Sequence, residues 1–229
     1  MLAELQNISK HYEQPGSGIR NTILNQVSLA IGPKDAIAIT GPSGSGKSTL
    51  LNILGTLDRP SSGQVILDKT RVDTLHENGL VNIRNRFIGF VFQMHHLLPQ
   101  LTLAENVLLP AMPLKDITLR EESIARAHRL LDRGGLKNHL HKYPLQMSVG
   151  ECQRAAVVRA LVNQPRLLLA DEPTGSLDAA NADQLGQLLI ELNQENDLAI
   201  VVVTHSMKLA ERMQKIYRLS SGEIQPYQP

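Results

Sequence analysis

The sequence predicts an α/β fold in which helices pack on a largely parallel β-sheet. Short apolar runs rich in β-branched residues alternate with segments of helical periodicity, which is typical of parallel strands joined by crossover helices. The candidate buried strands are 36–40 (AIAIT), 88–92 (IGFVF), 167–170 (LLLA) and 199–204 (AIVVVT). Apolar stripes at i, i+3, i+4 and i+7 predict two helices on that sheet, through Leu50, Ile53, Leu54 and Leu57 and through Leu185, Leu188, Leu189 and Leu192.

Length and composition indicate one folded domain. The chain has 229 residues, of which 42% are apolar and 20% charged, as in ordinary globular proteins. Its formal net charge is +1 and it has no dense Lys/Arg block, which argues against a general nucleic-acid surface. The single cysteine, Cys152, excludes an internal disulfide.

No segment has the pattern of a membrane or export signal. Residues 1–14 carry charge near their start and lack a long apolar stretch, so we expect no signal peptide. The longest apolar runs fall far short of the roughly 20 residues that a membrane helix needs. We therefore expect any membrane association to come through a partner.

Two further regions complete the expected domain. Residues 26–31 (QVSLAI) and 63–68 (GQVILD) alternate like half-buried strands and predict an antiparallel layer beside the parallel sheet. From about 94 to 164 the pattern is helical, which predicts a helical subdomain inserted into a core of residues 1–93 and 165–229.

One helix of this insertion has recognisable boundaries. A capping box of Thr118 and Glu121 predicts its start, and Gly134-Gly135 predicts its end. Between them, Ile124, His128 and Leu131 are expected to share a face.

A glycine-rich segment predicts a phosphate site. Residues 41–49 fit G-x-x-x-x-G-K-[ST], directly after a predicted strand and before a predicted helix, a context that a flexible Gly/Ser turn would rarely match. Backbone N–H groups of such a loop surround phosphates, Lys47 reaches the β- and γ-phosphates, and the Ser48 hydroxyl ligates Mg²⁺. The candidate nucleotide-binding residues are Gly41, Pro42, Ser43, Gly44, Ser45, Gly46, Lys47, Ser48 and Thr49.

Polar residues at other strand ends predict hydrolysis of the bound nucleotide. Asp171 and Glu172 end a buried strand, where one carboxylate can hold Mg²⁺ and its neighbour can deprotonate the attacking water. His205 is placed to contact the γ-phosphate, and Gln93 to touch Mg²⁺ or the water. Taken alone, each of the last two would more often be an ordinary polar residue at a strand end.

The stretch MSVGECQR, residues 147–154, contains a second capping box. Ser148 and Glu151 have the spacing of a helix start, and apolar residues follow. On one reading, this segment starts a helix and has no further role. On the other, the free backbone N–H groups of its first turn also bind a phosphate.

In this order, the phosphate loop, Gln93, MSVGECQR, Asp171-Glu172, SLD at 176–178 and His205 closely resemble the ATP-binding cassette family over nearly the whole chain. The resemblance implies a P-loop NTPase core of the RecA-like type that binds ATP and Mg²⁺, with Tyr12 stacked on adenine. It also implies a head-to-tail homodimer, in which the signature residues of one subunit face the ATP of the other and Asp178 lines the interface. Those signature residues are Ser148, Gly150 and Glu151.

The segments at 92–110 and 171–178 look most like separate ATPase subunits of the lipoprotein-releasing and macrolide-exporter branch. That likeness implies an integral membrane permease as partner, bound by the residues after Gln93, at the cytoplasmic face of a bacterial inner membrane. His95-His96 then belong to the partner surface, because two adjacent histidines without further ligands make a poor metal site. The chain ends soon after His205, so we expect no appended regulatory domain.

Val149 departs from the family pattern L-S-G-G-Q, because it replaces the first glycine. If this position needs a positive φ, valine is strained there. If the position is an ordinary first-turn helical residue, the valine backbone N–H stays available, and the remaining effect is crowding of its methyl groups against the partner subunit. We expect the ordinary helical conformation and, because of the crowding, an active but slowed ATPase.

Two alternative functions stay open at this point. One is a degenerate regulatory cassette with weak hydrolysis, and the other is a soluble cassette acting in DNA repair or translation. The compact insertion and near-neutral charge disfavour the latter.

Overall fold

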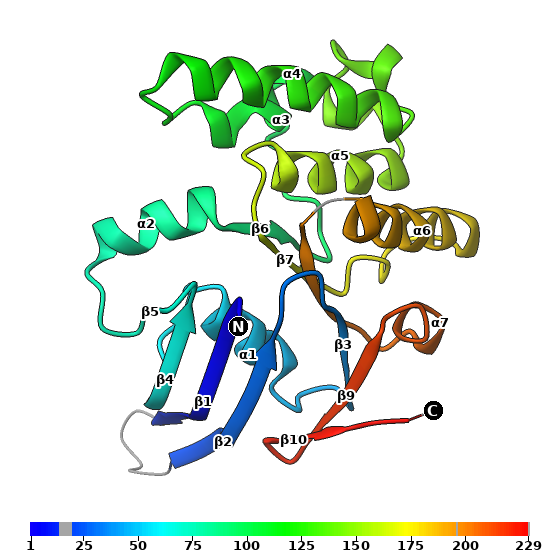
Figure 1. The fold of residues 1–229 in the computed structure, drawn as a ribbon. Coiled ribbons are helices and arrows are strands. Elements are labelled where there is room, and N and C mark those ends of the chain that lie inside the picture. The colour runs from blue at the N-terminus through cyan, green and yellow to red at the C-terminus, as the bar shows by residue number, and fades with distance from the viewer. Residues whose placement is uncertain (14–19, 196, 229) are drawn as a thin grey trace.

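The computed structural model describes residues 1–13, 20–195 and 197–228 of the chain. It is an α/β structure with two sheets, and Figure 1 shows helices stacked beyond one edge of the larger sheet. The larger sheet has the strand order β10-β9-β3-β8-β7-β6. Its strands are β3 (Ala36–Thr40), β6 (Ile88–Val91), β7 (Leu167–Asp171), β8 (Ala199–Val203), β9 (Lys215–Ser220) and β10 (Glu223–Pro226).

The four predicted buried strands are confirmed as β3, β6, β7 and β8. They are neighbours and run parallel, with Ala38 opposite Val202 and Leu169 opposite Val201. The sheet is not wholly parallel, because β10 returns antiparallel to β9 through a tight turn. Strands flanked by helices on both faces are apolar along their whole length, which is why these runs were legible in the sequence.

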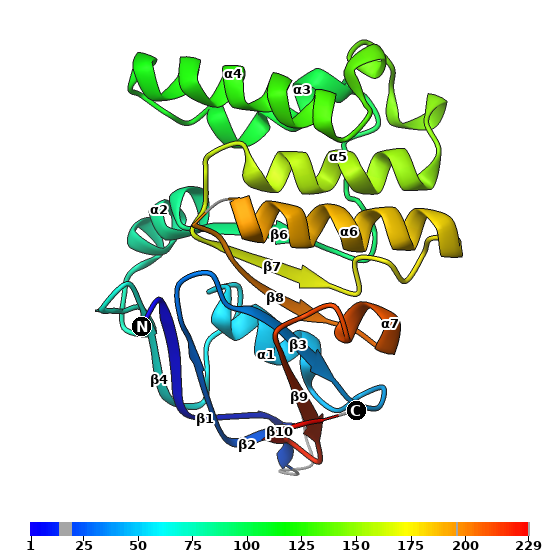
Figure 2. The same ribbon diagram turned by 45° about the vertical axis from the view of Figure 1, so that its right-hand side comes forward.

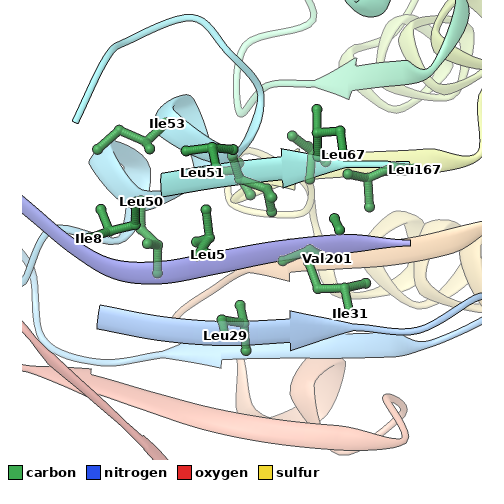
Figure 3. Packing of buried hydrophobic residues seen from close by; sticks show 14 of the residues in the cluster. Leu5, Ile8, Leu29, Ile31, Leu50, Leu51, Ile53, Leu67, Leu167 and Val201 are labelled. Atoms are coloured by element: carbon green, nitrogen blue, oxygen red, sulfur yellow. The ribbon is translucent and has the colours of Figure 1, made fainter. Parts of the chain in front are cut away.

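The antiparallel layer is also confirmed. It has the order β2-β1-β4-β5 and comprises β1 (Ala3–Glu13), β2 (Arg20–Ile31), β4 (Ser62–Leu67) and β5 (Thr70–Arg71). Along β2, the side chains of Val27, Leu29 and Ile31 are buried while those between them are exposed, as the alternation predicts. Figure 3 shows Leu5 and Ile8 of β1 directed toward the same apolar core as Leu50.

Helix α1 (Lys47–Leu54) lies in that core, but the predicted stripe is wrong at Leu57. The helix ends at Leu54, and Leu57 lies outside it with 48% of its surface exposed. The N–H groups of Leu57 and Asp58 both donate to the Asn52 carbonyl, so the chain turns instead of continuing the helix. Gly55 allows this turn to pack closely, because a Cβ there would lie 2.0 Å from Phe90 Cζ.

Helix α6 (Ala179–Glu195) covers the other face of the sheet, as predicted. Leu185, Leu189 and Leu192 are buried in one cluster with Ile200 and Val202 of β8, and Leu188 is partly buried against it. Two helices that were not predicted complete the core region: α2 (Glu77–Arg86) before β6, and the short α7 (Met207–Ala210) after β8.

Between β6 and β7 the described chain is helical, as predicted. It contains α3 (Leu103–Leu108), α4 (Ile117–Arg133), α5 (Val149–Leu161) and three single 3-10 turns at 109–111, 137–139 and 144–146. These helices enclose a separate apolar cluster that includes Leu103, Leu131 and Val158. Figure 2 shows α4, α5 and α6 stacked in succession on one side of the sheet. No helix in the described ranges is both long and apolar enough to cross a lipid bilayer.

The predicted start and face of α4 are wrong. Asp116 caps the helix, because its carboxylate accepts hydrogen bonds from the N–H groups of Thr118 and Leu119 at 2.9 and 3.3 Å. The buried side chains include Ser123, Ala127 and Leu131, whereas Ile124 and His128 face outward. Small residues are buried here because α4 lies close to α5, and the Ser123 hydroxyl bonds the Asn163 side chain at 3.2 Å. Gly134 ends the helix, as predicted.

Candidate active site

The polar residues singled out in the sequence meet at one edge of the larger sheet. The parallel strands β3, β8, β7 and β6 are neighbours, so their carboxyl ends share that edge. The phosphate loop follows β3, His205 follows β8, Asp171 and Glu172 end β7, and Gln93 follows β6. A cleft of about 710 Å³ lies there, and its lining includes all of these groups.

Backbone conformation explains the glycines of the phosphate loop. Gly41 and Gly46 have φ of 149° and 98°, which residues with a Cβ rarely adopt. Their surroundings leave no room either: a Cβ on Gly41 would lie 2.1 Å from the Leu219 carbonyl oxygen, and one on Gly46 3.0 Å from Ile23. The loop therefore packs tightly against Leu219 and Ile23, and Lys47 and Ser48 in the first turn of α1 line the cleft.

Lys47 is the central cation of the cleft. Its Nζ donates to the carbonyls of Gly41 at 3.0 Å and Pro42 at 2.9 Å, and lies 3.3 Å from His205 Nε2. Burial lowers the pKa of Lys47, while the nearby carboxylates of Glu172 and Asp171 act in the opposite direction. The lysine is thus held over the loop, within reach of anionic oxygens that enter the cleft.

Glu172 and His205 form a pair beside this lysine. Glu172 Oε1 lies 3.3 Å from His205 Nε2, and Glu172 Oε2 accepts a hydrogen bond from the His205 backbone N–H at 3.1 Å. Glu172 has φ of 46°, a left-handed conformation that costs a non-glycine residue about 1 kcal/mol or more. The fold therefore holds this carboxylate in a strained position at the mouth of a cleft, which is a common property of functional residues.

Asp171 has the chemistry of a cation ligand. Its Oδ1 is buried and accepts no hydrogen bond from any residue in the described ranges. An unsatisfied buried carboxylate oxygen is costly, and a bound Mg²⁺ would satisfy it. Ser48 and Gln93 line the same cleft as Asp171, so the cleft holds three side chains with oxygen atoms that can ligate the ion.

Tyr12 also lines the cleft. It lies near the end of β1, with 48% of its surface exposed. Its hydroxyl donates to Asp58 Oδ2 at 2.9 Å, and Lys10 Nζ lies 4.9 Å from the centre of its ring. Burial, followed by the Asp58 hydrogen bond, raises the pKa of Tyr12.

The capping box of MSVGECQR is confirmed. Ser148 Oγ accepts from the Glu151 N–H at 3.2 Å, and Glu151 Oε2 accepts from the Ser148 N–H at 2.7 Å. The Ser148 N–H hydrogen bond is the largest influence on the Glu151 carboxylate, whose pKa is lowered. Val149 is the first residue of α5, has no positive φ and is 52% exposed, which confirms the expected ordinary helical conformation.

The signature residues are not brought to the cleft of their own chain. Among the described residues that line the cleft, none comes from 147–154, and Asp178 is absent too. Instead the signature helix packs beside the start of α6: a Cβ on Gly150 would lie 2.5 Å from Asn181 Oδ1. The Asn181 amide donates in turn to Asp178 Oδ2 at 2.6 Å.

Two lining residues were missed in the sequence. Ile23 of β2 reaches the cleft beside Gly46, and nothing in its strand pattern distinguishes it from a core residue. Gly175 lies three residues after Glu172 and close to the Gln93 amide, since a Cβ on it would be 3.1 Å from Gln93 Nε2. Its position within DEPTGSLD was the available signal.

Comparison with known proteins decides the family. A sequence model described as ABC transporter matches residues 24–175. The chain belongs to the ABC transporter family. Two lipoprotein-releasing system ATP-binding proteins LolD are each 44% identical to this ABC ATPase. The relative from Legionella pneumophila (strain Paris) aligns over 96% of the chain and 95% of its own length, and that from Shewanella frigidimarina over 98% and 92%.

Solved structures support the same assignment. The dimeric structure of MJ0796, a bacterial ABC transporter cassette, aligns with this ABC ATPase at a TM-score of 0.87 and 37% identity, over 99% of each chain. A dimeric post-hydrolysis state of MJ0796 bound to ADP and Pi aligns at 0.86 and 36% identity. The chain is an ATP-hydrolysing cassette with the P-loop NTPase fold.

Proposed function

We propose that the chain is the ATPase subunit of a transporter of the lipoprotein-releasing type. The LolD relatives match nearly its full length, which supports this branch of the family. Residues 1–229 would act as a single ATPase domain, with a core of residues 1–93 and 165–229 and a helical subdomain at about 94–164. In this proposal the permease, and not the ATPase subunit, determines which cargo is moved and in which direction.

The working unit in this proposal is a head-to-tail homodimer. The observation that carries it is the separation of the cleft from the signature: one chain supplies Lys47 and Glu172, but its own Ser148 and Gly150 lie elsewhere. A second copy would present its α5 N-terminus to the γ-phosphate, where free N–H groups and the helix dipole favour negative charge. Asp178 would lie at the interface between the copies.

Within each site, this chain's residues divide the chemistry. The phosphate loop and Lys47 would bind the triphosphate, and Tyr12 would stack on adenine. Glu172 would take the proton of the attacking water, and His205 would contact the γ-phosphate. The buried Oδ1 of Asp171, with Ser48 and Gln93, fits a Mg²⁺ site, and the bound ion would neutralise charge on the phosphate oxygens.

The permease surface in this proposal begins directly after Gln93. Met94 and Leu98 are 60% and 40% exposed although both are apolar. Exposed apolar side chains at a protein surface are typical of an interface when they lie together. Through this contact the chain would sit at the cytoplasmic face of a bacterial inner membrane, with no part of it inserted into the lipid.

The test is the variant Glu172→Gln, which keeps the size of the side chain and removes the base. We expect normal binding of Mg-ATP, accumulation of an ATP-bound dimer and loss of turnover. Glu195→Gln is the matched control, because Glu195 is exposed, pairs with Arg133 and does not line the cleft, and it should hydrolyse ATP normally. Undiminished turnover by purified Glu172→Gln would remove Glu172 from this role.

A further inference from the structure

Tyr12 is held by two charged side chains that do not line the nucleotide cleft. Its hydroxyl donates to Asp58 Oδ2 at 2.9 Å, and Lys10 Nζ donates to the other oxygen, Oδ1, at 2.7 Å. Asp58 therefore accepts one hydrogen bond from Tyr12 and one from Lys10. Both contacts help to lower the pKa of the Asp58 carboxyl against the opposing effect of burial, so the anchor is charged near neutral pH.

Lys10 covers one face of the tyrosine ring. Its Nζ lies 4.9 Å from the ring centre, within the range of a cation–π contact, and its side chain is only 11% exposed. A further hydrogen bond to the Arg59 carbonyl at 2.8 Å fixes the ammonium in place. Tyr12 lines the cleft and Lys10 does not, so a ligand that enters the cleft meets the tyrosine and not the ammonium.

Asp58 ties this ring to the helix that begins at the phosphate loop. Helix α1 starts at Lys47, and the Asp58 N–H bonds the Asn52 carbonyl in the turn that follows its last residue. The anchor of Tyr12 is therefore hydrogen-bonded to the same helix whose first turn carries Lys47 of the phosphate loop. This contact limits movement of Asp58 relative to the loop.

We infer that Lys10 and Asp58 are positioning residues that orient Tyr12, so that one ring face receives the purine base at a fixed distance from the phosphate loop. This inference rests on the proposed stacking of adenine on Tyr12. Neither residue touches the nucleotide itself. Their contribution is to remove the rotational freedom of a half-exposed ring before the base arrives, which favours binding by preorganisation.

The experiment compares two ligands, Mg-ATP and inorganic tripolyphosphate with Mg²⁺, which has no base. Tyr12→Ala should weaken ATP binding and leave tripolyphosphate binding unchanged. Asp58→Asn should weaken ATP binding by roughly three- to tenfold, as expected for a lost aromatic contact, again without affecting tripolyphosphate. Tyr12→Phe keeps the ring and loses only the Asp58 hydrogen bond, so its affinity for ATP should lie between those of the wild type and Tyr12→Ala.

A double variant separates positioning from a general effect on the fold. In a Tyr12→Ala background, Asp58→Asn should cause no further loss of ATP affinity, because the two residues act through the same contact. The matched control is Asp68→Asn, since Asp68 forms its ion pair with Arg166 at 2.9 Å outside the cleft.

Three results would overturn parts of this reasoning, and they can be told apart. If Tyr12→Ala binds ATP normally, the stacking assignment itself fails. If Tyr12→Ala weakens ATP binding but Asp58→Asn and Tyr12→Phe do not, only the positioning role fails. Equal losses for ATP and tripolyphosphate in Asp58→Asn would show that Asp58 supports the phosphate loop and not the ring.

Discussion

Replacing Val149 with glycine should make the ABC ATPase dimerise more readily and turn over faster. Val149 begins α5 with an ordinary helical backbone, and 52% of its surface is exposed. In the proposed dimer its methyl groups lie between this helix turn and the partner's bound phosphates. Removing them opens space while Ser148 and Glu151 keep the cap.

Val149→Gly should lower the stability of the single chain but strengthen the association of two chains. Within one chain, the glycine costs about 0.4 kcal/mol in helix propensity, and the half-buried side chain gives up about 0.8 kcal/mol of burial. The sum of about 1 kcal/mol should lower the melting temperature by roughly 2–4 °C. Crowding of about 1 kcal/mol at each of two equivalent sites should be relieved in the dimer, which corresponds to roughly 30-fold tighter association.

Dimerisation would be measured by sedimentation with ATP in a Glu172→Gln background, and turnover by phosphate release from the assembled transporter. Val81→Gly is the matched control for sedimentation, because Val81 is 50% exposed on α2, away from the signature. It should lose stability without any gain in association. If Val149→Gly is no faster and dimerises no better than the wild type, crowding is wrong and valine fits the closed site.

Three further outcomes are expected. Lys47→Ala should weaken ATP binding by roughly ten- to a hundredfold, since it deletes a charged donor to the phosphates; unchanged affinity in a titration would contradict the phosphate-loop reading. Gly55→Ala should lower the free energy of unfolding in urea by about 1–3 kcal/mol, because its Cβ would meet the Phe90 ring, and an unshifted midpoint would refute this. Glu151, with its lowered pKa, stabilises the fold above the ordinary glutamate pKa and loses that contribution as pH falls through its own. Glu151→Gln should therefore show a smaller loss of stability on acidification between about pH 5 and pH 3, whereas parallel curves would disprove the link.

The sequence was most informative where chemistry and backbone geometry coincide. Gly41 and Gly46 have backbone conformations that favour glycine, so their spacing, together with the following Lys47 and Ser48, located the phosphate loop in the sequence. The positions of Asp171 and His205 at strand ends could be predicted, because the strands before them are runs of apolar residues. Parallel pairing then brings those ends together without further information.

The errors arose where tertiary contacts choose between similar local patterns. Asp116 and Thr118 are both competent caps, and the closeness of α4 to α5 favoured a face built on Ser123 and Ala127. Leu57 continued a helical stripe, but packing of Gly55 against Phe90 ended the helix first. The hydrogen bond between Tyr12 and Asp58 joins positions far apart in the chain, so it could not be predicted from the sequence pattern.

The left-handed backbone of Glu172 has a consequence for how this protein can change. Glycine at that position would relieve about 1 kcal/mol or more of backbone strain, so Glu172→Gly should melt at a higher temperature than Glu172→Ala, which loses the same contacts to His205 but keeps a Cβ. In the proposed role of Glu172 as the base, backbone strain and activity place opposite demands on this residue. Selection for thermal resistance alone would favour glycine there, whereas selection for turnover would favour the carboxylate.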